Sequence, residues 1–428
     1  MLSARAARVE ASLAPFGAIS EANMEATERY LESGLREPAF GAAPQAARVR
    51  VVSGRVFLTM LPSSAERSDP VRFGFAAMHA AGLLGQMREL VVTHALPDVD
   101  FFVSLMDETL VCPESASGHI APGFAPAAPV LHWNADRRCS RQVVFPSYDY
   151  VWPNQNYSGG SCWRFDAHPR PPWRERLGRA VFRGANRGAP QRAALAATLR
   201  GNCTGTGSKE DADVDCFIYD QVCAVNAPCE RGAFVDAIAH HLSPTQQARF
   251  KYAIDADGVV STLRLKNLLL SGSLVLKARS PNYQWFHADL VDGVHLVEVR
   301  SDMTNLRASI ARARRADSWA RGVASNGEAF AQLHLSPSAA AEYQAAVLRA
   351  LAARLTYSPR AVGCEAPNRA PNPAEMQRCL APHAQWDAAA VPTDFFPANA
   401  LELRRGQCAG SLQELPEFKA ANQAPQPA

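Results

Sequence analysis

A short arginine-rich segment joins a predicted strand to a predicted helix. A short apolar strand with Val181 and Phe182 runs into a corner at Arg183 and Gly184. Arg187 lies in the loop that follows, and Arg192 comes just after Pro190 at the helix start. Proline is favoured in the first turn of a helix, where its missing N–H has no partner to lose. Such a junction directs backbone N–H groups and the positive end of a helix dipole to one point. The segment therefore predicts a phosphate-binding site, although its residues also allow an arginine-rich surface loop.

A second basic segment follows a predicted strand that ends near Asp255. Ser261 is suited to cap a helix that we expect to run to Leu270, and Arg264 would then lie in its first turn. An arginine in that position opposes the helix dipole, at a cost of about 0.3–1 kcal/mol. A bound diphosphate would offset this cost, because a guanidinium group pairs with phosphate in bidentate fashion. The alternative is a solvated surface arginine.

One carboxylate, Asp107, comes directly after a continuous apolar strand at 99–105. A strand of this kind is typical of a buried parallel sheet. Ligands of open α/β sheets bind beside the carboxyl ends of such strands. The position therefore allows a catalytic carboxylate, although by itself it favours a residue that only caps the strand.

Strands and helices alternate in both halves of the chain, which is typical of two doubly wound α/β domains. The predicted strands cover 99–105, 249–253, 274–277 and 295–299, and a hairpin is predicted around Ser53 and Gly54. The predicted helices cover 20–35, 73–93, 261–270, 303–315 and 336–355. We expect an N-terminal lead-in at 1–45, domains at 46–175 and 176–335, a C-terminal helix at 336–357 and an irregular tail at 358–428.

The composition is that of a chain with full hydrophobic cores, since 47% of its 428 residues are hydrophobic. The formal net charge of +3 is close to neutral and gives no reason to expect binding to nucleic acid or to a membrane surface. The apolar runs are too short to span a bilayer. The first residues lack the apolar core of a signal peptide.

Ten cysteines are present, and none of them forms a Cys-x-x-Cys pair of the kind found in zinc ribbons. Four lie between residues 203 and 229, in a segment rich in glycine and aspartate. We interpret this cluster as a disulfide-stapled loop of a protein in an oxidising compartment. Free thiols in a cytosolic enzyme are the alternative. Cys364 and Cys379 are candidates for holding the C-terminal tail.

Four segments, in order along the chain, resemble blocks of the CAP10-like glycosyltransferases, which form glycosyltransferase family 90. This family includes Rumi-type protein O-glucosyltransferases and fungal capsule xylosyltransferases. The segments are Leu96-Pro-Asp-Val-Asp-Phe with Asp107, Trp173 through Phe-Arg-Gly184, Lys251-Tyr through Ser271-Gly-Ser-Leu-Val, and His295-Leu-Val-Glu-Val through Leu306. The resemblance runs from about residue 49 to 357.

The resemblance implies a GT-B fold, in which two Rossmann-like domains face each other across a cleft. The acceptor would bind to the domain at 46–175 and the donor nucleotide to the domain at 176–335. The implied activity is transfer of glucose or xylose from UDP-glucose or UDP-xylose, with inversion, to a hydroxyl of a protein or glycan. It implies no metal and no cofactor beyond the donor substrate. It also implies location in the endoplasmic reticulum or Golgi lumen, or secretion.

The resemblance also assigns roles to residues. Asp107 matches the catalytic base of the family. Arg192 matches a nucleotide-binding arginine, although this chain has one extra residue between Gly184 and Arg192. Asn186 is a candidate for the role of a family serine, because Ala185 stands where the family often has that serine. The loop that holds UDP matches Val259, Val260, Ser261, Thr262, Leu263 and Arg264.

The chemistry of such a transfer agrees with these residue types. Inverting transfer is a single displacement, so one carboxylate must take the proton of the attacking hydroxyl. The leaving diphosphate gathers negative charge, which fixed cations or N–H groups must stabilise. Asp107 would supply the base, and Arg192 and Arg264 would supply the cations.

The sequence also suggests three alternatives. Gly159-Gly-Ser-Cys162-Trp163 approximates the signature of papain-like peptidases, with His295 at a suitable distance, but the prolines at 169, 171 and 172 forbid the helix that such a nucleophile begins. A metal-dependent transferase would need an Asp-x-Asp such as Asp255 and Asp257, which we interpret as turn formers. A catalytically inactive glycan-binding relative of the same fold is the third.

Overall fold

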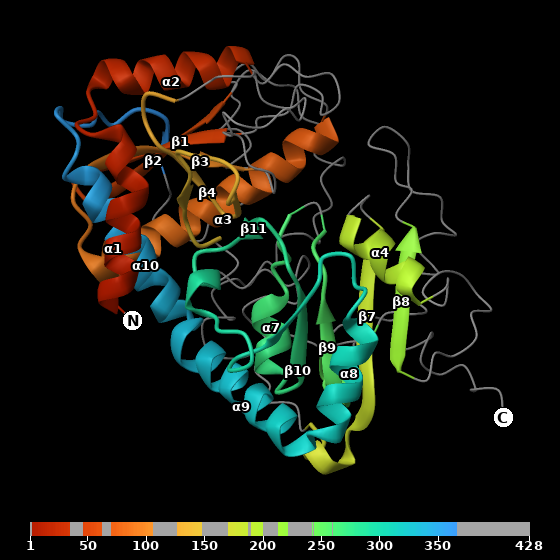
Figure 1. Cartoon of the computed structure of the whole chain (residues 1–428). Helices are drawn as coiled ribbons and strands as arrows, with labels where there is room; N and C mark the ends of the chain where they lie inside the picture. The colour runs from red at the N-terminus through yellow and green to blue at the C-terminus, as the bar shows by residue number, and fades with distance from the viewer. Residues whose placement is uncertain are drawn as a thin grey trace, which may run out of the picture.

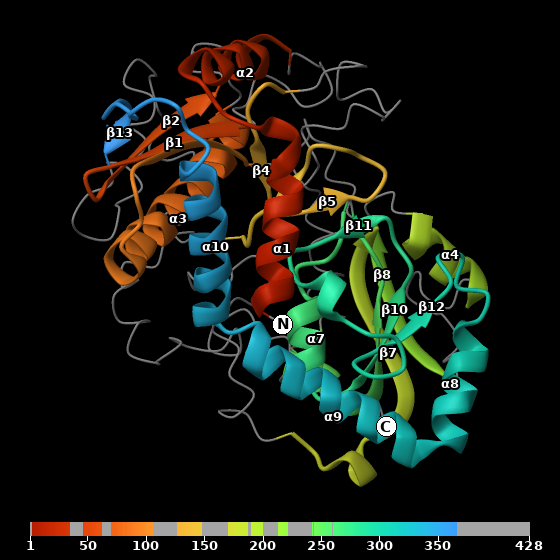
Figure 2. The ribbon, with the colours of Figure 1, turned by 60° about the vertical axis from the view of Figure 1, so that its left-hand side comes forward.

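The computed structural model describes residues 2–34, 46–61, 70–105, 126–147, 170–186, 190–199, 213–220, 242, 244–258 and 260–365 (Figure 1). In these ranges the chain forms a mixed α/β structure with two large sheets and one two-stranded ribbon. The first sheet lies in the red-to-orange part of the ribbon, joined by one short blue strand near the end of the described chain, and the second sheet lies in the yellow-to-cyan part (Figures 1 and 2).

The first sheet has six strands in the order β13-β2-β1-β3-β4-β6. Their bounds are β1 (Ala46–Val52), β2 (Arg55–Leu61), β3 (Val99–Ser104), β4 (Val130–His132), β6 (Val143–Val144) and β13 (Cys364–Glu365). The pairs β3–β4 and β4–β6 are parallel, whereas the pairs that join β3, β1, β2 and β13 are antiparallel. This sheet is therefore mixed, and only its β3–β4–β6 part is parallel as predicted.

The predicted hairpin and buried strand of this sheet are confirmed. Ser53 and Gly54 connect β1 to β2 with φ angles of 50° and 74°. All six residues of β3 are buried, as the continuous apolar pattern indicated. The helix predicted at 73–93 is α3 (Pro70–His94). The two residues of β13 come from the segment in which we expected no regular structure.

The second sheet is parallel throughout, with the strand order β12-β10-β9-β7-β8. Its strands are β7 (Leu177–Asn186), β8 (Val214–Asp220), β9 (Phe250–Asp255), β10 (Leu274–Ala278) and β12 (Val297–Val299). Helices α4 (Pro190–Thr198) and α8 (Leu306–Arg315) pack on one face, and α7 (Leu265–Leu270) packs on the other. Helices on both faces of a parallel sheet confirm the predicted doubly wound class for this part of the chain.

The remaining helices surround the sheets. They are α1 (Leu2–Leu13), α2 (Glu21–Gly34), α6 (Pro244–Gln247), α9 (Asp317–His334) and α10 (Pro337–Ala352), with short 3-10 turns η1 (Ala14–Phe16), η5 (Trp173–Glu175) and η6 (His287–Asp289). The chain leaves the second sheet through α9 and returns along α10 to the first sheet (Figures 1 and 2). Ser336 caps α10, because its hydroxyl accepts a hydrogen bond from the N–H of Ala339 at 3.2 Å.

Three α-helices were not predicted: α1, the four-residue α6 and α9. Helix α1 buries Val9 and Leu13 in the core, and ion pairs from Arg5 and Arg8 to Asp289 of η6 also hold it. The segment of α9 contains Gly322 and Gly327, which lower helix propensity. A Cβ at Gly327 would lie 2.3 Å from the carbonyl oxygen of His295, so this glycine allows α9 to approach that backbone closely. Tertiary packing therefore overrides local preference in α9.

The two sheets meet at a short ribbon formed by β5 (Ala135–Asp136) and β11 (Asn282–Tyr283), which pair antiparallel. The N–H of Arg137 donates to the carbonyl of Pro281 at 2.9 Å, and the Arg137 guanidinium lies 5.0 Å from the ring centre of Tyr283. We call this contact region the junction. Figure 2 shows the ribbon between the two sheets. The junction matters because it brings residues of both halves to one place.

Three cysteines of the described residues are disulfide-bonded, namely Cys139, Cys216 and Cys364. Cys216 belongs to the cluster for which disulfides were predicted, and the prediction is confirmed for this residue. Cys364 is disulfide-bonded as well, but its predicted link to Cys379 is not tested, because residue 379 lies outside the described residues. No disulfide was predicted for Cys139. None of the helices that the structure describes is long and apolar enough to cross a membrane.

A hydrogen bond from Tyr357 fastens the end of the C-terminal helical region to the first sheet. Its hydroxyl donates to Asp100 at 2.9 Å, and Asp100 is only 1% exposed. A hydrogen bond to a charged group contributes about 1.5–3 kcal/mol. The Tyr357→Phe variant should therefore lose about that much free energy of unfolding in denaturant titration. Tyr252→Phe is the matched control: the buried Tyr252 hydroxyl has no hydrogen-bond partner among the residues described, so its removal should cost nothing. Equal losses in the two variants would contradict the expectation.

Candidate functional site

Two of the predicted nucleotide-binding residues, Arg192 and Arg264, meet at the ring of Phe182 in β7, near the carboxyl edge of the second sheet. The guanidinium carbon of Arg264 lies 4.6 Å from the ring centre, and that of Arg192 lies 5.8 Å from it. Guanidinium groups are attracted to an aromatic face within about 6 Å. One aromatic ring thus gathers two cations that come from segments more than 70 positions apart in the chain.

Arg192 is enclosed by two glycines. It lies in the first turn of α4, and its residue is 7% exposed. A Cβ at Gly184 would lie 3.4 Å from its Nη1, and a Cβ at Gly258 would lie 3.1 Å from its Nη2. The same Nη2 donates to the carbonyl of Ala256 at 3.5 Å. The absence of side chains at the two glycines therefore makes the space in which this guanidinium lies.

Alanine at Gly184 should disturb this arrangement. Its Cβ would lie 3.1 Å from Cζ of Phe182, a ring that is 1% exposed and has little room to move. We expect Gly184→Ala to weaken binding of a nucleoside diphosphate about fivefold to tenfold, near the cost of one displaced contact. Isothermal calorimetry with UDP measures this change.

Gly178 provides the matched control for that variant. It lies in the same strand, and a Cβ built on it meets nothing within 4 Å. Gly178→Ala should bind the nucleotide as the wild-type chain does. If both alanine variants bound the nucleotide equally well, the role given to Gly184 would be wrong.

Arg264 reaches the same ring from the other side of β9. Its Nη1 donates to the carbonyl of Arg183, and its Nε lies 4.0 Å from Oδ1 of Asp255. The side chain as a whole is 23% exposed, but Nε and Nη2 of its guanidinium are buried. The side chain of Arg183 points elsewhere, because it pairs with Asp215 of β8.

The helix predicted to begin at Ser261 begins at Leu265 instead. The structure therefore corrects two expectations: Arg264 immediately precedes the helix rather than lying in its first turn, and Ser261 is not its cap. The hydroxyl of Ser261 donates to the side chain of Asn134, which follows β4 of the first sheet. With only six residues, α7 offers no sizeable helix dipole, so the cationic character of this site comes from side chains.

The predicted corner at Arg183 and Gly184 is also wrong. Strand β7 continues to Asn186, because residues 183–186 pair in register with residues 217–220 of β8. The loop predicted between strand and helix thus begins only after Asn186. Asn186 ends the strand opposite Asp220.

The loop before α7 is fixed from several directions. Val260 accepts a hydrogen bond from the N–H of Gly258 at 3.0 Å, and Gln284 donates to the carbonyl of Thr262 at 2.8 Å. The Thr262 hydroxyl donates to Oδ1 of Asp255. Leu263 is half-buried in the turn that leads to the helix. The described residues of this loop lead directly to Arg264, and their contact with a nucleotide stays a prediction.

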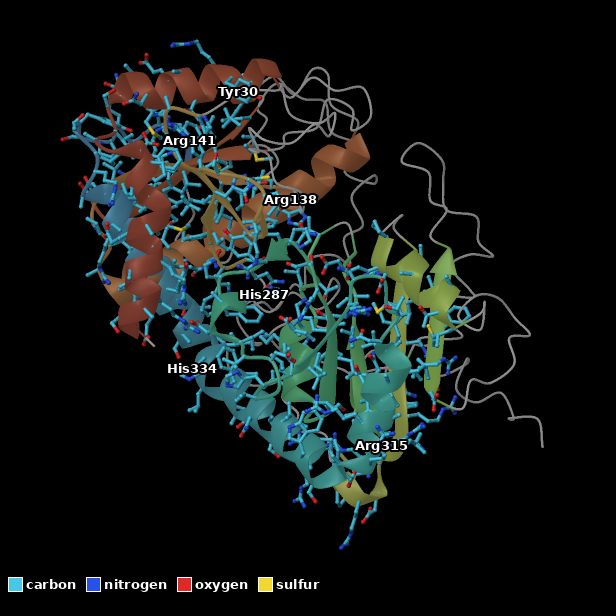
Figure 3. All side chains as sticks on the ribbon, in the orientation of Figure 1. Tyr30, Arg138, Arg141, His287, Arg315 and His334 are labelled. Atoms are coloured by element: carbon cyan, nitrogen blue, oxygen red, sulfur yellow. The ribbon has the colours of Figure 1, made fainter. Side chains whose placement is uncertain are left out.

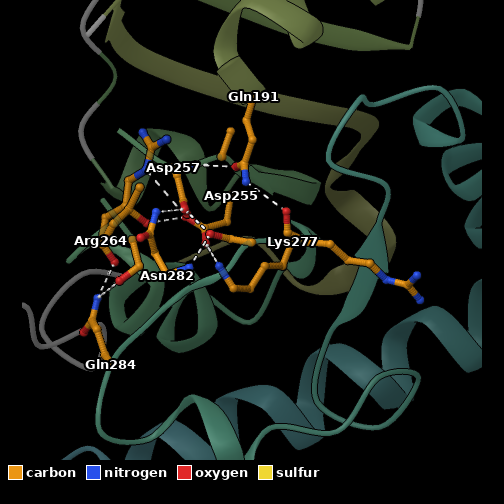
Figure 4. Close-up of polar contacts among 12 residues, drawn as sticks. Gln191, Asp255, Asp257, Arg264, Lys277, Asn282 and Gln284 are labelled. Atoms are coloured by element: carbon orange, nitrogen blue, oxygen red, sulfur yellow. Dashed lines mark hydrogen bonds and ion pairs between the residues drawn. The ribbon is translucent and has the colours of Figure 1, made fainter. Parts of the chain in front are cut away.

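Asp255, which we expected only to form a turn, is fully buried at the end of β9. Its Oδ2 accepts from Nζ of Lys277 at 2.9 Å (Figure 4). Burial by itself would raise the pKa of this carboxyl, but Lys277 and Arg264 together hold it below its usual value. Asp255 is therefore a charged member of the site. One sequence signal could have identified Asp255: it ends a buried strand, and the next predicted strand ends in Lys277.

Asp257 lies two residues further on and has different surroundings. Its N–H donates to Gln191 at 2.7 Å, and its Oδ2 accepts from Asn282 at 3.0 Å and from the Ser280 hydroxyl (Figure 4). Burial raises the pKa of this carboxyl above its usual value. The contacts tie α4, the end of β9 and the junction together. This residue, too, was missed when the Asp-x-Asp was interpreted as a turn.

Two of the predicted site residues, Asp107 and Val259, lie outside the described residues. The structure does describe the strand that leads to Asp107. β3 runs parallel to β4, with Val103 opposite Leu131, so the two strands end at the same edge of the first sheet. That edge is also where Asn134 contacts Ser261.

Two alternatives to this site were a metal centre and a papain-like peptidase. Among the described residues, no group of three histidine, cysteine, aspartate or glutamate side chains could hold a metal ion. Cys162 lies outside the described ranges, whereas His295 accepts a hydrogen bond at Nδ1 from the N–H of Val291 at 3.0 Å. Its ring lies 5.0 Å from that of Phe330 in α9. His295 therefore serves to hold the loop before β12.

Comparison with known proteins identifies the class. The sequence model of Glycosyl transferase family 90 matches residues 29–365, and the chain belongs to this family. This confirms the resemblance on which the site prediction was based.

Individual relatives carry related names. The chain is 28% identical to protein O-glucosyltransferase 2 of Danio rerio over 265 residues, which cover 61% of this chain and 48% of that protein. It is 27% identical to protein O-glucosyltransferase 3 of Homo sapiens over 267 residues, covering 62% and 48%. It is 23% identical to protein O-glucosyltransferase 1 of Homo sapiens over 257 residues, covering 58% and 60%. The matched region thus spans about half the length of the first two relatives.

Proposed function

We propose that this protein is an inverting glycosyltransferase that moves glucose or xylose from a UDP-sugar to a hydroxyl of a protein or glycan. One observation carries the proposal: Arg192 and Arg264 are held over a single aromatic ring at the carboxyl edge of a parallel sheet. That edge is where ligands of open α/β sheets bind. Membership of glycosyl transferase family 90, and similarity to proteins named O-glucosyltransferases, agree with it.

The proposed architecture is GT-B, with an acceptor-binding half at 46–175 and a donor-binding half at 176–335. The contact between Asn134 and Ser261 supports it, because these residues follow the carboxyl ends of β4 and β9. The carboxyl edges of both sheets therefore point to one region. A base at the end of β3 and cations beyond β9 could then act on the same bound molecule.

In this proposal Arg192 and Arg264 bind the diphosphate, and Gly184 provides the room that Arg192 needs. Val259, Val260, Ser261, Thr262 and Leu263 line the nucleotide, partly through backbone groups, and Asn186 adds a polar contact. Two guanidinium groups supply the positive charge that a leaving diphosphate requires, so the proposal includes no metal and no cofactor.

The reaction is one displacement. The acceptor oxygen attacks the anomeric carbon of the sugar from the side opposite the diphosphate, and the bond from that carbon to the phosphate oxygen breaks. Asp107 takes the proton of the acceptor hydroxyl as the new bond forms. UDP leaves with the bonding electron pair, and the cations at the edge of the second sheet stabilise its charge.

We further propose that the protein works in an oxidising compartment, in the endoplasmic reticulum or Golgi lumen or outside the cell. The disulfide bonds at Cys139, Cys216 and Cys364 support this, because disulfides persist in oxidising compartments and are rare in the cytosol.

Calorimetric titration of the purified chain with UDP tests the nucleotide site. We expect saturable binding in the micromolar-to-millimolar range and much weaker binding of uridine, which lacks the diphosphate. No binding of UDP at millimolar concentration would overturn the proposal. A screen for hydrolysis of UDP-glucose and UDP-xylose then identifies the donor.

A catalytically inactive glycan-binding relative is the second candidate, because Ala185 replaces a serine that the family often has. The same hydrolysis screen separates the two. Release of UDP from either donor supports the enzyme, and glycan binding without any turnover supports the inactive relative.

A further inference from the structure

Lys277 and Asp255 form an ion pair inside the second sheet. They lie directly opposite each other on the parallel strands β10 and β9, and Nζ of Lys277 is 2.9 Å from Oδ2 of Asp255. The carboxylate is 0% exposed and the lysine side chain is 11% exposed. Taking two charges out of water is costly, so a buried pair such as this one adds little to stability. Its retention calls for another reason.

Arg264 is the third charge of this cluster. Its Nε lies 4.0 Å from Oδ1 of Asp255, the oxygen that also accepts from the Thr262 hydroxyl. The three formal charges of Asp255, Lys277 and Arg264 sum to +1. Without Lys277 the charges of Asp255 and Arg264 would sum to zero. Of the two cations, only Arg264 would then remain to pair with the carboxylate.

We propose that Lys277 is a positioning residue of the diphosphate site, which neutralises Asp255 so that the charge of Arg264 acts on the bound diphosphate. The proposal rests on the proposed function, because it requires a diphosphate at Arg264. It adds a charge-balancing pair that has no direct contact with the ligand. Figure 4 shows Lys277 and Arg264 approaching Asp255 from different elements.

The protonation of the pair agrees with this role. Burial alone would lower the pKa of Lys277, but Asp255 and Asp257 raise it above its usual value. Burial alone would raise the pKa of Asp255, and Lys277 and Arg264 lower it. Both partners are therefore charged near neutral pH. The nearby His287 contributes no charge, because burial and Lys277 hold the pKa of its ring well below the usual value.

The experiment compares UDP and uridine binding by calorimetry in the wild-type chain, Lys277→Met, Asp255→Asn and the double variant. Thermal unfolding of each variant shows which of them are folded at the titration temperature. The double variant removes both charges at once, so it keeps the net charge of the cluster at +1 and stays informative if Lys277→Met unfolds.

We expect Lys277→Met to bind UDP about tenfold more weakly than the wild-type chain, on the scale of one charge interaction near a protein surface, and to bind uridine unchanged. Asp255→Asn should bind UDP at least as tightly as the wild type, and the double variant should match the wild type within about threefold. The sign of the Asp255→Asn effect is the decisive result, because a merely structural pair would weaken binding in both single variants.

Weaker binding of UDP by folded Asp255→Asn would overturn the inference, and so would either of two further results. One is that the single variants lose affinity for UDP and for uridine to the same extent, and that this loss follows their loss of thermal stability. The other is a double variant that binds UDP more than tenfold more weakly than the wild type while still folded. Failure of the wild-type chain itself to bind UDP would instead contradict the proposed function, so the two failures are distinguishable.

Discussion

The Asp107→Asn variant should transfer sugar about 10²–10⁴-fold more slowly than the wild-type chain, because that is the usual contribution of a general base. The asparagine keeps the shape of the side chain but cannot take the proton of the attacking hydroxyl. The measurement is the rate of UDP release from UDP-glucose or UDP-xylose, with an acceptor or with water. UDP affinity should not change, since the proposed base does not hold the diphosphate.

Asp98→Asn is the matched control for this variant. Asp98 lies just before β3, at the end of the strand opposite to Asp107, and its Oδ1 accepts a hydrogen bond from the N–H of Ser53 at 2.7 Å. An asparagine oxygen can accept the same bond, so this variant should keep the wild-type rate. A wild-type rate in Asp107→Asn as well would show that the base is another residue.

The Arg264→Met variant should bind UDP about 10- to 100-fold more weakly, because a hydrogen bond to a charged group contributes about 1.5–3 kcal/mol. The guanidinium is held by the carbonyl of Arg183 and the ring of Phe182, so the wild-type protein does not have to order it when the diphosphate binds. Methionine keeps much of the apolar stem and loses the charge. Calorimetry with UDP measures the loss.

Arg315→Met serves as the control for charge. Arg315 is an exposed residue at the end of α8, and Figure 3 shows it at the far end of the second sheet from the junction region near Arg138 and His287. Arg315→Met changes the net charge by the same amount as Arg264→Met, and it should leave the affinity for UDP unaltered. Equal losses in both variants would mean that overall charge, rather than the placement of Arg264, determines the affinity.

These two variants test different halves of the proposal. Loss of the Asp107 carboxylate should lower the rate of sugar transfer and leave the affinity for UDP unchanged. Loss of the Arg264 guanidinium should mainly lower the affinity for UDP. A protein in which both losses acted only on stability would be a structural relative rather than an enzyme. The distinction follows from chemistry, because the base acts in the transition state whereas the diphosphate is bound throughout.

Much of the fold could be predicted where the pattern is long and regular. The strand β3, the helix α3 and the hairpin of β1 and β2 were found from continuous apolar residues, length and a Ser-Gly turn. Helix α9 could not be found, because its glycines and polar residues give a weak local preference that packing against the backbone of His295 overrides. The continuation of β7 through Gly184 was missed for a similar reason, since pairing with β8 supplies the hydrogen bonds.

The chain's amino-acid order alone determined the family, the alternation of strands and helices, and the residue types that could handle a diphosphate. These follow from local patterns that need no knowledge of distant neighbours. Only the tertiary structure decided that Asp255 is a buried partner of Lys277 rather than a turn residue, and that Ser261 contacts Asn134 instead of capping a helix. Such roles depend on which side chains of other strands come within about 3 Å. No local pattern contains that information, because burial changes the cost of a charge and the value of each partner.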